Sequence, residues 1–243
     1  MADGRPPEHV VILGLGPSVT TYVETVKRLG SRRAFSDEVW GINAIGDVIA
    51  CDRIFHMDDI KVQEARAAAA PQSNIAHMVA WLKGYRGRVY TSRKRPGYRC
   101  LVEYPLEAVI NWGGLAYFNS TAAYAIAYAG YLGVKRVTLF GIDYTLPNMH
   151  AGERGRACCE FWLGLMSGRG VQIVVPETSS LMDACAPERE LLYGFDCSDV
   201  TMTDREDGGI EIAVTERAEA VDAAEIERRY DHTRHVNRLL DKG

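Results

Sequence analysis

A helix-to-strand unit at residues 118–144 constrains the fold of this chain more than any other segment. It begins with a polar helix start at Ser120 and Thr121, continues through an apolar helix to a turn at Gly133, and ends in a strand that leads into Gly141-Ile142-Asp143-Tyr144. Polar residues therefore gather at a helix N-terminus and at the carboxyl end of a strand, the two places where an open α/β sheet binds phosphate groups. The unit predicts a nucleotide site at one edge of a sheet.

Apolar strands and helices alternate along most of the chain. Strands are expected at residues 9–13, 38–43, 53–57, 88–92, 136–140 and 171–175, and helices at 18–29, 65–70, 74–84, 105–112, 120–132 and 156–167. This alternation predicts a single Rossmann-like α/β domain over residues 9–199, with a mostly parallel sheet covered by helices on both faces.

The last part of the chain has a different pattern. Residues 200–203 and 210–214 flank a polar turn at 204–209, which predicts a small hairpin. From Glu216 onward, apolar residues at helical spacing among many charges predict a long amphipathic helix. Residues 200–243 are therefore expected to form an appendage that packs on the domain or pairs with a second copy of the chain in a homo-oligomer.

Composition excludes several classes of protein. The 47% apolar and 25% charged content and the net charge of −4 are typical of a folded protein with no overall attraction to nucleic acid or membranes. The six cysteines contain no Cys-x-x-Cys pair, which favours buried free thiols in a reducing compartment. The first residues lack the apolar core of a signal peptide, and the longest apolar stretch is too short to cross a bilayer. We expect a cytoplasmic protein without a membrane span.

A glycine turn, Gly14-Leu15-Gly16-Pro17-Ser18, follows the first apolar strand. Glycines allow the backbone to approach a phosphate closely, and Ser18 at the helix start offers a hydroxyl. The turn is not the dinucleotide fingerprint, because it lacks the third glycine and contains a proline, and a tight strand–helix connection explains the same residues. Asn43, after the second strand, either reads a nucleobase or ribose through its amide or forms a turn before Gly46.

The order of these motifs resembles that of the bacterial sialyltransferases of glycosyltransferase family 42. Those proteins carry Gly-x-Gly-Pro-Ser after the first strand, Asn after the second, Ser/Thr at a helix start and Gly-Ile-Asp-Tyr after the following strand. The chain also resembles a wider group of motility-associated proteins that includes an archaeal-type hydroxymethylpterin diphosphokinase. The resemblance covers residues 9 to about 183 and implies a variant of the GT-A glycosyltransferase fold. It implies a nucleotide pocket lined by Gly14, Gly16, Ser18, Asn43, Ser120, Thr121 and Gly141.

The same resemblance implies the catalytic residues. In the sialyltransferases a histidine general base precedes a helix containing Glu-Phe, and here His150 precedes Glu160-Phe161 at the matching distance. It would deprotonate an acceptor hydroxyl, a role that suits a group titrating near neutral pH. Asp143 and Tyr144 complete the implied catalytic set, with Tyr144 replacing one of two tyrosines that steady the leaving phosphate. The alternative for His150 is a histidine in a surface loop.

The chain departs from the family pattern at two positions. Leu15 stands where the family has an asparagine within the first glycine turn, and the loop over residues 141–150 is much shorter than the family's lid. The donor is therefore left open between UDP-linked and CMP-linked sugars.

Two adjacent carboxylates, in His56-Met57-Asp58-Asp59, follow the third strand, where the sialyltransferases carry an asparagine. Such a pair resembles the acidic motif with which many other glycosyltransferases hold a divalent ion against a diphosphate. Asp58, with Asp59 beside it, is the candidate ligand for Mg²⁺ or Mn²⁺. The alternative is that Asp59 caps a helix while Asp58 is solvated.

A basic run extends from Lys83 to Arg99 without one acidic residue and is interleaved with Tyr85, Tyr90 and Tyr98. Arginine and tyrosine together favour contacts with phosphates and stacking on unpaired bases. A charged strand edge that resists pairing explains the same run. The residues expected to contact nucleic acid or another polyanion are Arg88, Arg93, Lys94, Arg95, Tyr98 and Arg99.

Three functions remain open from these patterns. The first is an inverting glycosyltransferase whose acceptor is either a hydroxymethylated pyrimidine in DNA, as in phage DNA modification, or a glycan. The second is a magnesium-dependent diphosphotransferase of the pterin-kinase type, with Asp58 and Asp59 on the metal. The third is a non-catalytic module that binds nucleotides or nucleic acid.

Overall fold

The computed structural model describes residues 6–144, 149–185, 192, 194–195, 197–217, 222 and 224, and within the second range it describes side chains from Arg154 onward. The chain divides into two compact units, residues 1–185 and residues 186–243.

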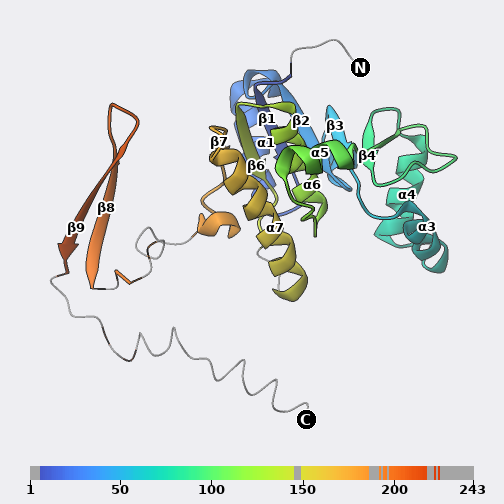
Figure 1. Ribbon diagram of the computed structural model, residues 1–243. Helices are drawn as coiled ribbons and strands as arrows, with labels where there is room; N and C mark the ends of the chain where they lie inside the picture. Colours follow the sequence, from blue (N-terminus) through green and yellow to red (C-terminus); the bar gives the residue numbers. More distant parts are fainter. Residues whose placement is uncertain are drawn as a thin grey trace. The chain divides into compact units, whose positions relative to one another are not determined.

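A seven-stranded sheet forms the centre of the first unit (Figure 1). The strand order is β5-β4-β3-β2-β1-β6-β7, and all pairings between neighbouring strands are parallel. The strands are β1 (His9–Leu13), β2 (Glu38–Ile42), β3 (Arg53–Phe55), β4 (Val89–Thr91), β5 (Leu101–Glu103), β6 (Arg136–Phe140) and β7 (Gln172–Val174). The predicted α/β fold with a mostly parallel sheet is confirmed.

Helices cover both faces of this sheet, which is why the central strands are apolar along their whole length. One face packs against α1 (Val19–Leu29), α2 (Ile45–Val48), α3 (Ile60–Ala69) and α4 (Asn74–Gly84). The other packs against α5 (Leu106–Gly113), α6 (Thr121–Leu132) and α7 (Met149–Ser167). Short 3₁₀ turns lie at η1 (Arg32–Ala34) and η2 (Leu181–Asp183). Among the described helices, none has the length and apolar character to cross a bilayer.

Four helices and strands of the first unit differ from the prediction by more than two residues at an end, and one of them, the short helix α2, was not expected. The helix α3 begins at Ile60, five residues earlier than expected, because the Asp59 side chain accepts a hydrogen bond from the Lys61 backbone N–H and caps it. The helix α7 begins at Met149 instead of residue 156. The strand β5 was not expected either, and its three residues are too few to show a periodic pattern.

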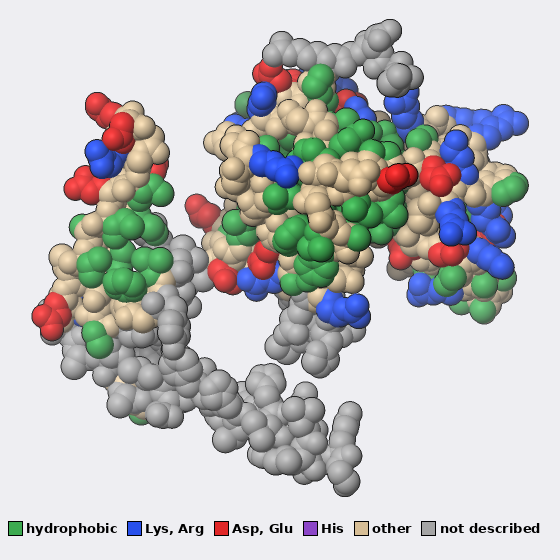
Figure 2. All heavy atoms as spheres, viewed as in Figure 1, with side chains coloured by type: hydrophobic (Ala, Val, Ile, Leu, Met, Phe, Trp, Pro, Cys, Tyr) green, Lys and Arg blue, Asp and Glu red, His purple; other side chains and the backbone are tan. Residues whose placement is uncertain are grey.

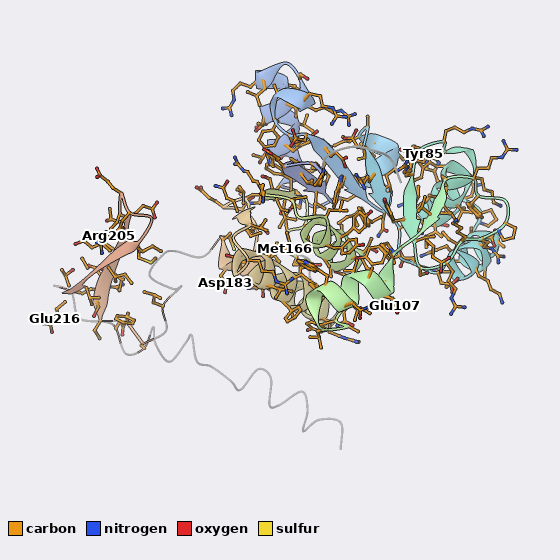
Figure 3. The ribbon with its side chains drawn as sticks, turned by 45° about the horizontal axis from the view of Figure 1, so that its top comes forward. Tyr85, Glu107, Met166, Asp183, Arg205 and Glu216 are labelled. Carbon is orange, nitrogen blue, oxygen red and sulfur yellow. The ribbon has the colours of Figure 1, made fainter. Side chains whose placement is uncertain are left out.

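The described part of the second unit is an antiparallel hairpin of β8 (Ser198–Asp204) and β9 (Ile210–Glu216). Figure 3 labels Arg205 at its turn and Glu216 at the end of β9. Met202 lies opposite Ile212 in the ladder, and both side chains are exposed. The hairpin was predicted, but β9 continues through Glu216, where the amphipathic helix was expected to begin. Most of the remaining residues of that helix lie outside the described part of the chain.

Candidate functional site

The strand order of the first unit reverses between β1 and β6, since β2 to β5 lie on one side of β1 and β6 and β7 on the other. In open α/β sheets, ligands bind at the carboxyl ends of the strands beside such a switch point. The connections that leave the sheet there run through residues 14–18 and 141–144. They are the two segments in which the sequence predicted a nucleotide site.

The glycines of these two connections pack against each other. A Cβ atom on Gly14 would lie 2.3 Å from the Gly141 carbonyl oxygen, and one on Gly141, whose φ is +69°, would lie 2.2 Å from the Gly14 oxygen. The Gly16 N–H donates to the Gly141 oxygen at 2.8 Å. Close packing of the protein's own backbone therefore requires these glycines. This agrees with the alternative interpretation, in which the glycine turn is a tight strand–helix connection.

Ser18 and Asp143 form a buried clamp between the same two connections. Asp143 accepts hydrogen bonds from the backbone N–H of Ser18 at 2.8 Å and from its hydroxyl at 2.5 Å, while the Ser18 Oγ accepts from the Gly141 N–H at 2.7 Å. Both side chains are almost fully buried. Ser18 makes no side-chain cap on α1, and its proton goes to Asp143, so the hydroxyl is not offered to a phosphate in this arrangement. We refer to Ser18, Gly141 and Asp143 as the switch-point clamp.

The N-terminus of α6 lies at the same carboxyl edge and carries Ser120 as its cap. Its Oγ accepts from the Ala123 N–H at 3.3 Å and from the Tyr144 hydroxyl at 3.1 Å. Tyr144 has a φ of 49°, a left-handed conformation that is unusual for a bulky residue and is concentrated at functional sites. Burial raises the pKa of its phenol, which stays protonated near neutral pH. Thr121 is the first, half-buried residue of the helix.

Two adjacent thiols of α7 meet this helix N-terminus. The Sγ atoms of Cys158 and Cys159 lie 3.7 and 3.5 Å from the Ser120 Oγ, and the Asn119 N–H donates to Cys158 at 3.3 Å. The hydrogen bond from Cys159 and that from Asn119 lower the pKa of Cys158 to about 6, whereas burial raises the pKa of Cys159. Their burial was predicted, but their place beside Ser120 was not.

A second group of polar residues lies directly after the carboxyl ends of three adjacent strands, β2, β3 and β4. Ile42 pairs with Phe55, and Phe55 with Tyr90, so the next residues, Asn43, His56 and Thr91, lie side by side. Asn43 adopts a φ of 53°, and its Oδ1 lies 3.1 Å from Nδ1 of His56.

His56 and Thr91 each hold a buried polar atom that is left without a partner. His56 is 1% exposed and Thr91 is 0% exposed. Within the described residues, neither His56 Nε2 nor Thr91 Oγ1 has a hydrogen-bond partner. Burial lowers the pKa of His56, so the ring is neutral near pH 7. Unpaired buried polar atoms are uncommon and costly, so they indicate a missing polar partner. The sequence placed His56 at a strand end, but the prediction chose Asp58 beside it.

The predicted metal ligands do not form a site. Asp59 caps α3 and Asp58 is exposed, as the alternative interpretation expected. Across the described ranges, no three side chains of His, Cys, Asp or Glu are grouped so that they could hold a metal ion. The described residues therefore show no preformed site with three protein ligands for Mg²⁺ or Mn²⁺.

The predicted base, His150, lies in the first turn of α7 and not in a loop, because the helix begins at Met149. Its side chain lies outside the described residues. Its role as a base therefore stays a prediction.

Among the described residues of the basic run, Tyr90 and Tyr98 do not form the predicted surface for stacking on bases. Tyr90 and Tyr98 are 5% and 6% exposed, so neither ring is available to an unpaired base. Tyr98 and Arg95 are bound to Glu64 of α3. Arg88, Arg93, Lys94 and Arg99 are exposed.

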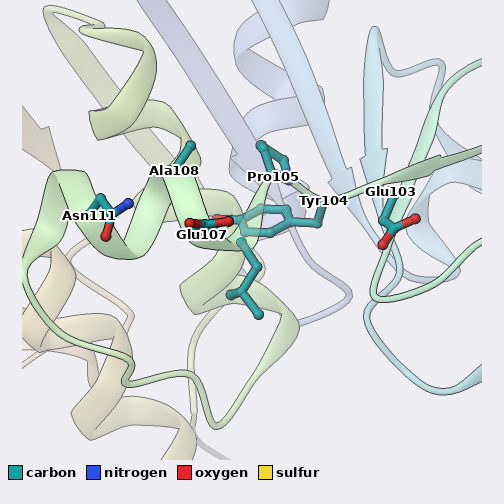
Figure 4. A pocket seen from close by; sticks show the side chains of 7 residues that line it. Glu103, Tyr104, Pro105, Glu107, Ala108 and Asn111 are labelled. Carbon is teal, nitrogen blue, oxygen red and sulfur yellow. The ribbon is translucent and has the colours of Figure 1, made fainter.

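A hollow of about 590 Å³ lies at the start of α5, lined by residues 103–108 and Asn111 (Figure 4). Two carboxylates, Glu103 and Glu107, belong to its lining. It contains none of the residues that the sequence predicted for the site.

The fold and the switch point define a doubly wound α/β protein. No protein-family model matches the chain, and no curated protein sequence matches it either. Two solved structures are similar to it at 13% sequence identity. One is a point mutant of the α-2,3/8-sialyltransferase CstII, with a TM-score of 0.43 over 92% of this chain and 100% of that one. The other is CstII from Campylobacter jejuni in complex with the substrate analogue CMP-3FNeuAc, with a TM-score of 0.38 over 91% of this chain and 98% of that one. Because both TM-scores are below 0.5, the fold assignment rests on the sheet topology.

Proposed function

We propose that this chain is an inverting glycosyltransferase that takes a sugar from a nucleotide-sugar donor and transfers it to an acceptor hydroxyl. The observation that carries the proposal is the pair of unpartnered buried atoms, His56 Nε2 and Thr91 Oγ1, beside Asn43 at the carboxyl edge of the sheet. Both atoms are enclosed in this structure, so a hydroxyl or amide of a bound donor would satisfy them only once the groups that cover them move apart. A nucleotide sugar carries many such groups, and the order of the sequence motifs favours the same class of ligand.

The leaving phosphate is proposed to bind at the N-terminus of α6. The positive end of the helix dipole and the free N–H groups of a first turn favour an anion there. Tyr144, protonated and held beside Ser120, would give up its hydrogen bond to Ser120 and donate the hydroxyl hydrogen to a phosphate oxygen as negative charge develops on it. Asp143 is proposed to act as a positioning residue, because the switch-point clamp fixes the backbone immediately before Tyr144.

The bond changes follow from inversion. His150 is proposed to accept the proton of the acceptor hydroxyl while that oxygen attacks the anomeric carbon and the bond to the nucleotide phosphate breaks. Its place in the first turn of α7 puts it on the helix that also carries Cys158 and Cys159 beside Ser120. A positioned base of this kind contributes about 10²–10⁴-fold to the rate.

For the acceptor we propose a hydroxymethylated pyrimidine in DNA, which presents a primary hydroxyl. The exposed arginines and lysine of the basic run support an anionic acceptor. A glycan acceptor is the alternative in this class. The donor stays open between UDP-linked and CMP-linked sugars.

Thermal-shift measurements with UDP-sugars, CMP-sugars and ATP, with and without Mg²⁺ or Mn²⁺, test the proposal. A donor present at about 100 times its Kd should stabilise the protein by about 2.7 kcal/mol. Comparison of the measurements with and without added metal shows whether a matching donor needs a divalent ion. A response to ATP and Mg²⁺ alone would replace the transferase with the diphosphotransferase.

Substitution of the base separates catalysis from binding. The variant His150→Ala should retain the thermal shift with donor and lose sugar transfer. His77→Ala is the matched control, since His77 is an exposed histidine of α4 whose ring pairs with Asp47. Equal transfer by both variants would refute His150 as the base, and donor binding without any transfer by the parent protein would leave a binding module as the better description.

A further inference from the structure

Five basic side chains between α4 and β5 are exposed and have no acidic partner among the described residues. They lie in the segment before β4 and in the crossover from β4 to β5, and we call them the basic surface: Arg86, Arg88, Arg93, Lys94 and Arg99. In Figure 2, Lys and Arg side chains gather over the part of the first unit formed by α3, α4 and β4. The whole chain has a net charge of −4, so this positive charge is local.

One carboxylate anchors the crossover that carries three of these residues. Glu64 of α3 accepts hydrogen bonds from Arg95 and, at 3.1 Å, from the Tyr98 hydroxyl. The Lys83 Nζ lies 3.9 Å from the same carboxylate and 5.6 Å from the centre of the Tyr98 ring. The bond from Arg95 lowers the pKa of Glu64, which therefore stays charged. Glu64 pairs with two of the seven cations of the run, offsets one positive charge, and holds the loop that displays three of the other five.

We propose that the basic surface binds the sugar-phosphate backbone of double-stranded nucleic acid. Four of its five cations are arginines, whose planar guanidinium groups match phosphate oxygens in bidentate geometry. A duplex carries one negative charge per about 1.7 Å of axis, so the five cations before and after β4 would meet several phosphates at once.

The aromatic residues offer little support for a binding mode based on unpaired bases, since only Tyr85 among the three tyrosines of the run is partly exposed. Tyr90 and Tyr98 are buried, and Tyr85 packs on Trp81 with ring centres 4.9 Å apart (Tyr85 is labelled in Figure 3). Proteins that bind single strands without sequence preference use such rings as stacking platforms. Here the contacts are to the backbone, and they carry no direct information about base sequence.

A membrane surface fits the same charges less well. Of the large apolar side chains that are exposed in the described part of the chain, none lies between residues 83 and 100. A peripheral membrane site of modest charge normally adds apolar side chains that enter the interface.

This inference deepens the proposed function. It rests on that function only where it treats the bound nucleic acid as the acceptor of the sugar. Binding to the backbone requires neither the donor nor His150, so the two proposals fail separately.

Fluorescence anisotropy with the full chain, in the absence of donor, tests the inference. The probes are a labelled DNA duplex, its separate single strand and labelled vesicles of anionic phospholipid. If all five cations contact phosphates, the logarithm of the binding constant should fall with the logarithm of salt concentration at a slope of about −4.5. Duplex should bind at least as tightly as single strand.

Charge-removing variants locate the site. The double variant Arg93→Ala, Lys94→Ala should reduce the salt slope by about 1.8, because two phosphate contacts are lost. The matched control, Lys27→Ala with Arg28→Ala, removes the same charge from the exposed last turn of α1 and should leave the slope unchanged. All four substitutions lie on exposed side chains, and circular dichroism melting curves confirm that the variants fold.

Three results would overturn the inference. They are equal losses in the two double variants, tighter binding of single strand than of duplex, and binding to vesicles without binding to duplex. Loss of duplex binding with sugar transfer to a glycan intact would leave the proposed transferase standing. Duplex binding without any donor-dependent thermal shift would leave the basic surface standing and the transferase refuted.

Discussion

Replacing Asp143 with Ala should destabilise the first unit by several kcal/mol. The carboxylate accepts from the N–H of Ser18 at 2.8 Å and from its hydroxyl at 2.5 Å, and Asp143 is only 4% exposed. Alanine leaves both donors buried without an acceptor, and each such unmade bond costs about 1–3 kcal/mol. Two of them lower the free energy of unfolding by roughly 2–6 kcal/mol, a large share of the 5–15 kcal/mol typical of a folded protein.

Urea unfolding followed by circular dichroism measures this loss, with Asp143→Asn as a milder variant that preserves the shape of the side chain. In the Ser18→Ala background, Asp143→Ala removes only the bond from the backbone N–H at position 18. The two substitutions should therefore show a coupling energy of about 1–3 kcal/mol in a double-mutant cycle. The denaturant slope m should not change, because the surface exposed on unfolding stays the same.

Asp37→Ala is the matched control for burial. Its carboxylate also accepts two bonds, from the N–H groups of Glu8 and His9 at 2.8 Å each, but it is exposed, so water replaces the lost acceptor. The expected cost is about 1 kcal/mol or less. If Asp143→Ala costs no more than Asp37→Ala, the reasoning that the switch-point clamp is a buried structural link is refuted.

Three further predictions follow from the site. His56→Gln should make the free energy of unfolding fall less steeply as the pH is lowered. Burial lowers the His56 pKa, so below about pH 6.5 the unfolded chain binds a proton that the folded chain does not. The substitution should therefore remove up to about 1.4 kcal/mol per pH unit from the slope of stability against pH, measured by urea unfolding from about pH 7 to about pH 5. An unchanged slope would contradict this. Cys158→Ser should abolish an ultraviolet thiolate signal that titrates near pH 6 in the parent protein, and its survival in that variant would assign the signal to another thiol. Gly141→Ala should cost more than Gly133→Ala, because both positions have left-handed φ but only at Gly141 would the new Cβ meet backbone, 2.2 Å from the Gly14 oxygen. In urea unfolding, Gly133→Ala should lower the free energy of unfolding by about 1–2 kcal/mol, and Gly141→Ala should lower it by about 1–3 kcal/mol more. Equal losses of free energy would contradict the packing argument.

Local patterns determined most of the first unit. The strands β1 and β6 have the predicted bounds, because a run of apolar residues between turn signals is sufficient to indicate a strand buried on both faces. The helix α4 also has its predicted bounds, with Ser73 accepting from the Ala76 N–H at its start. The strand β5 and the first two turns of α7 were missed, since three residues show no period and the first turns of α7 lack an apolar stripe.

Tertiary structure alone decided what the polar residues do. The sequence identified Gly16, Ser18 and Asp143 as one site, but only the adjacency of β1 and β6 shows that Ser18 and Asp143, 125 residues apart, satisfy each other. In the same way, Glu64 neutralises Arg95 across 31 residues, and α7 brings Cys158 to Ser120 across 38. A sequence pattern reports burial and period, which depend on near neighbours along the chain. Hydrogen-bond partners depend on which elements pack together and on the directions of their side chains, and the folded chain alone sets those.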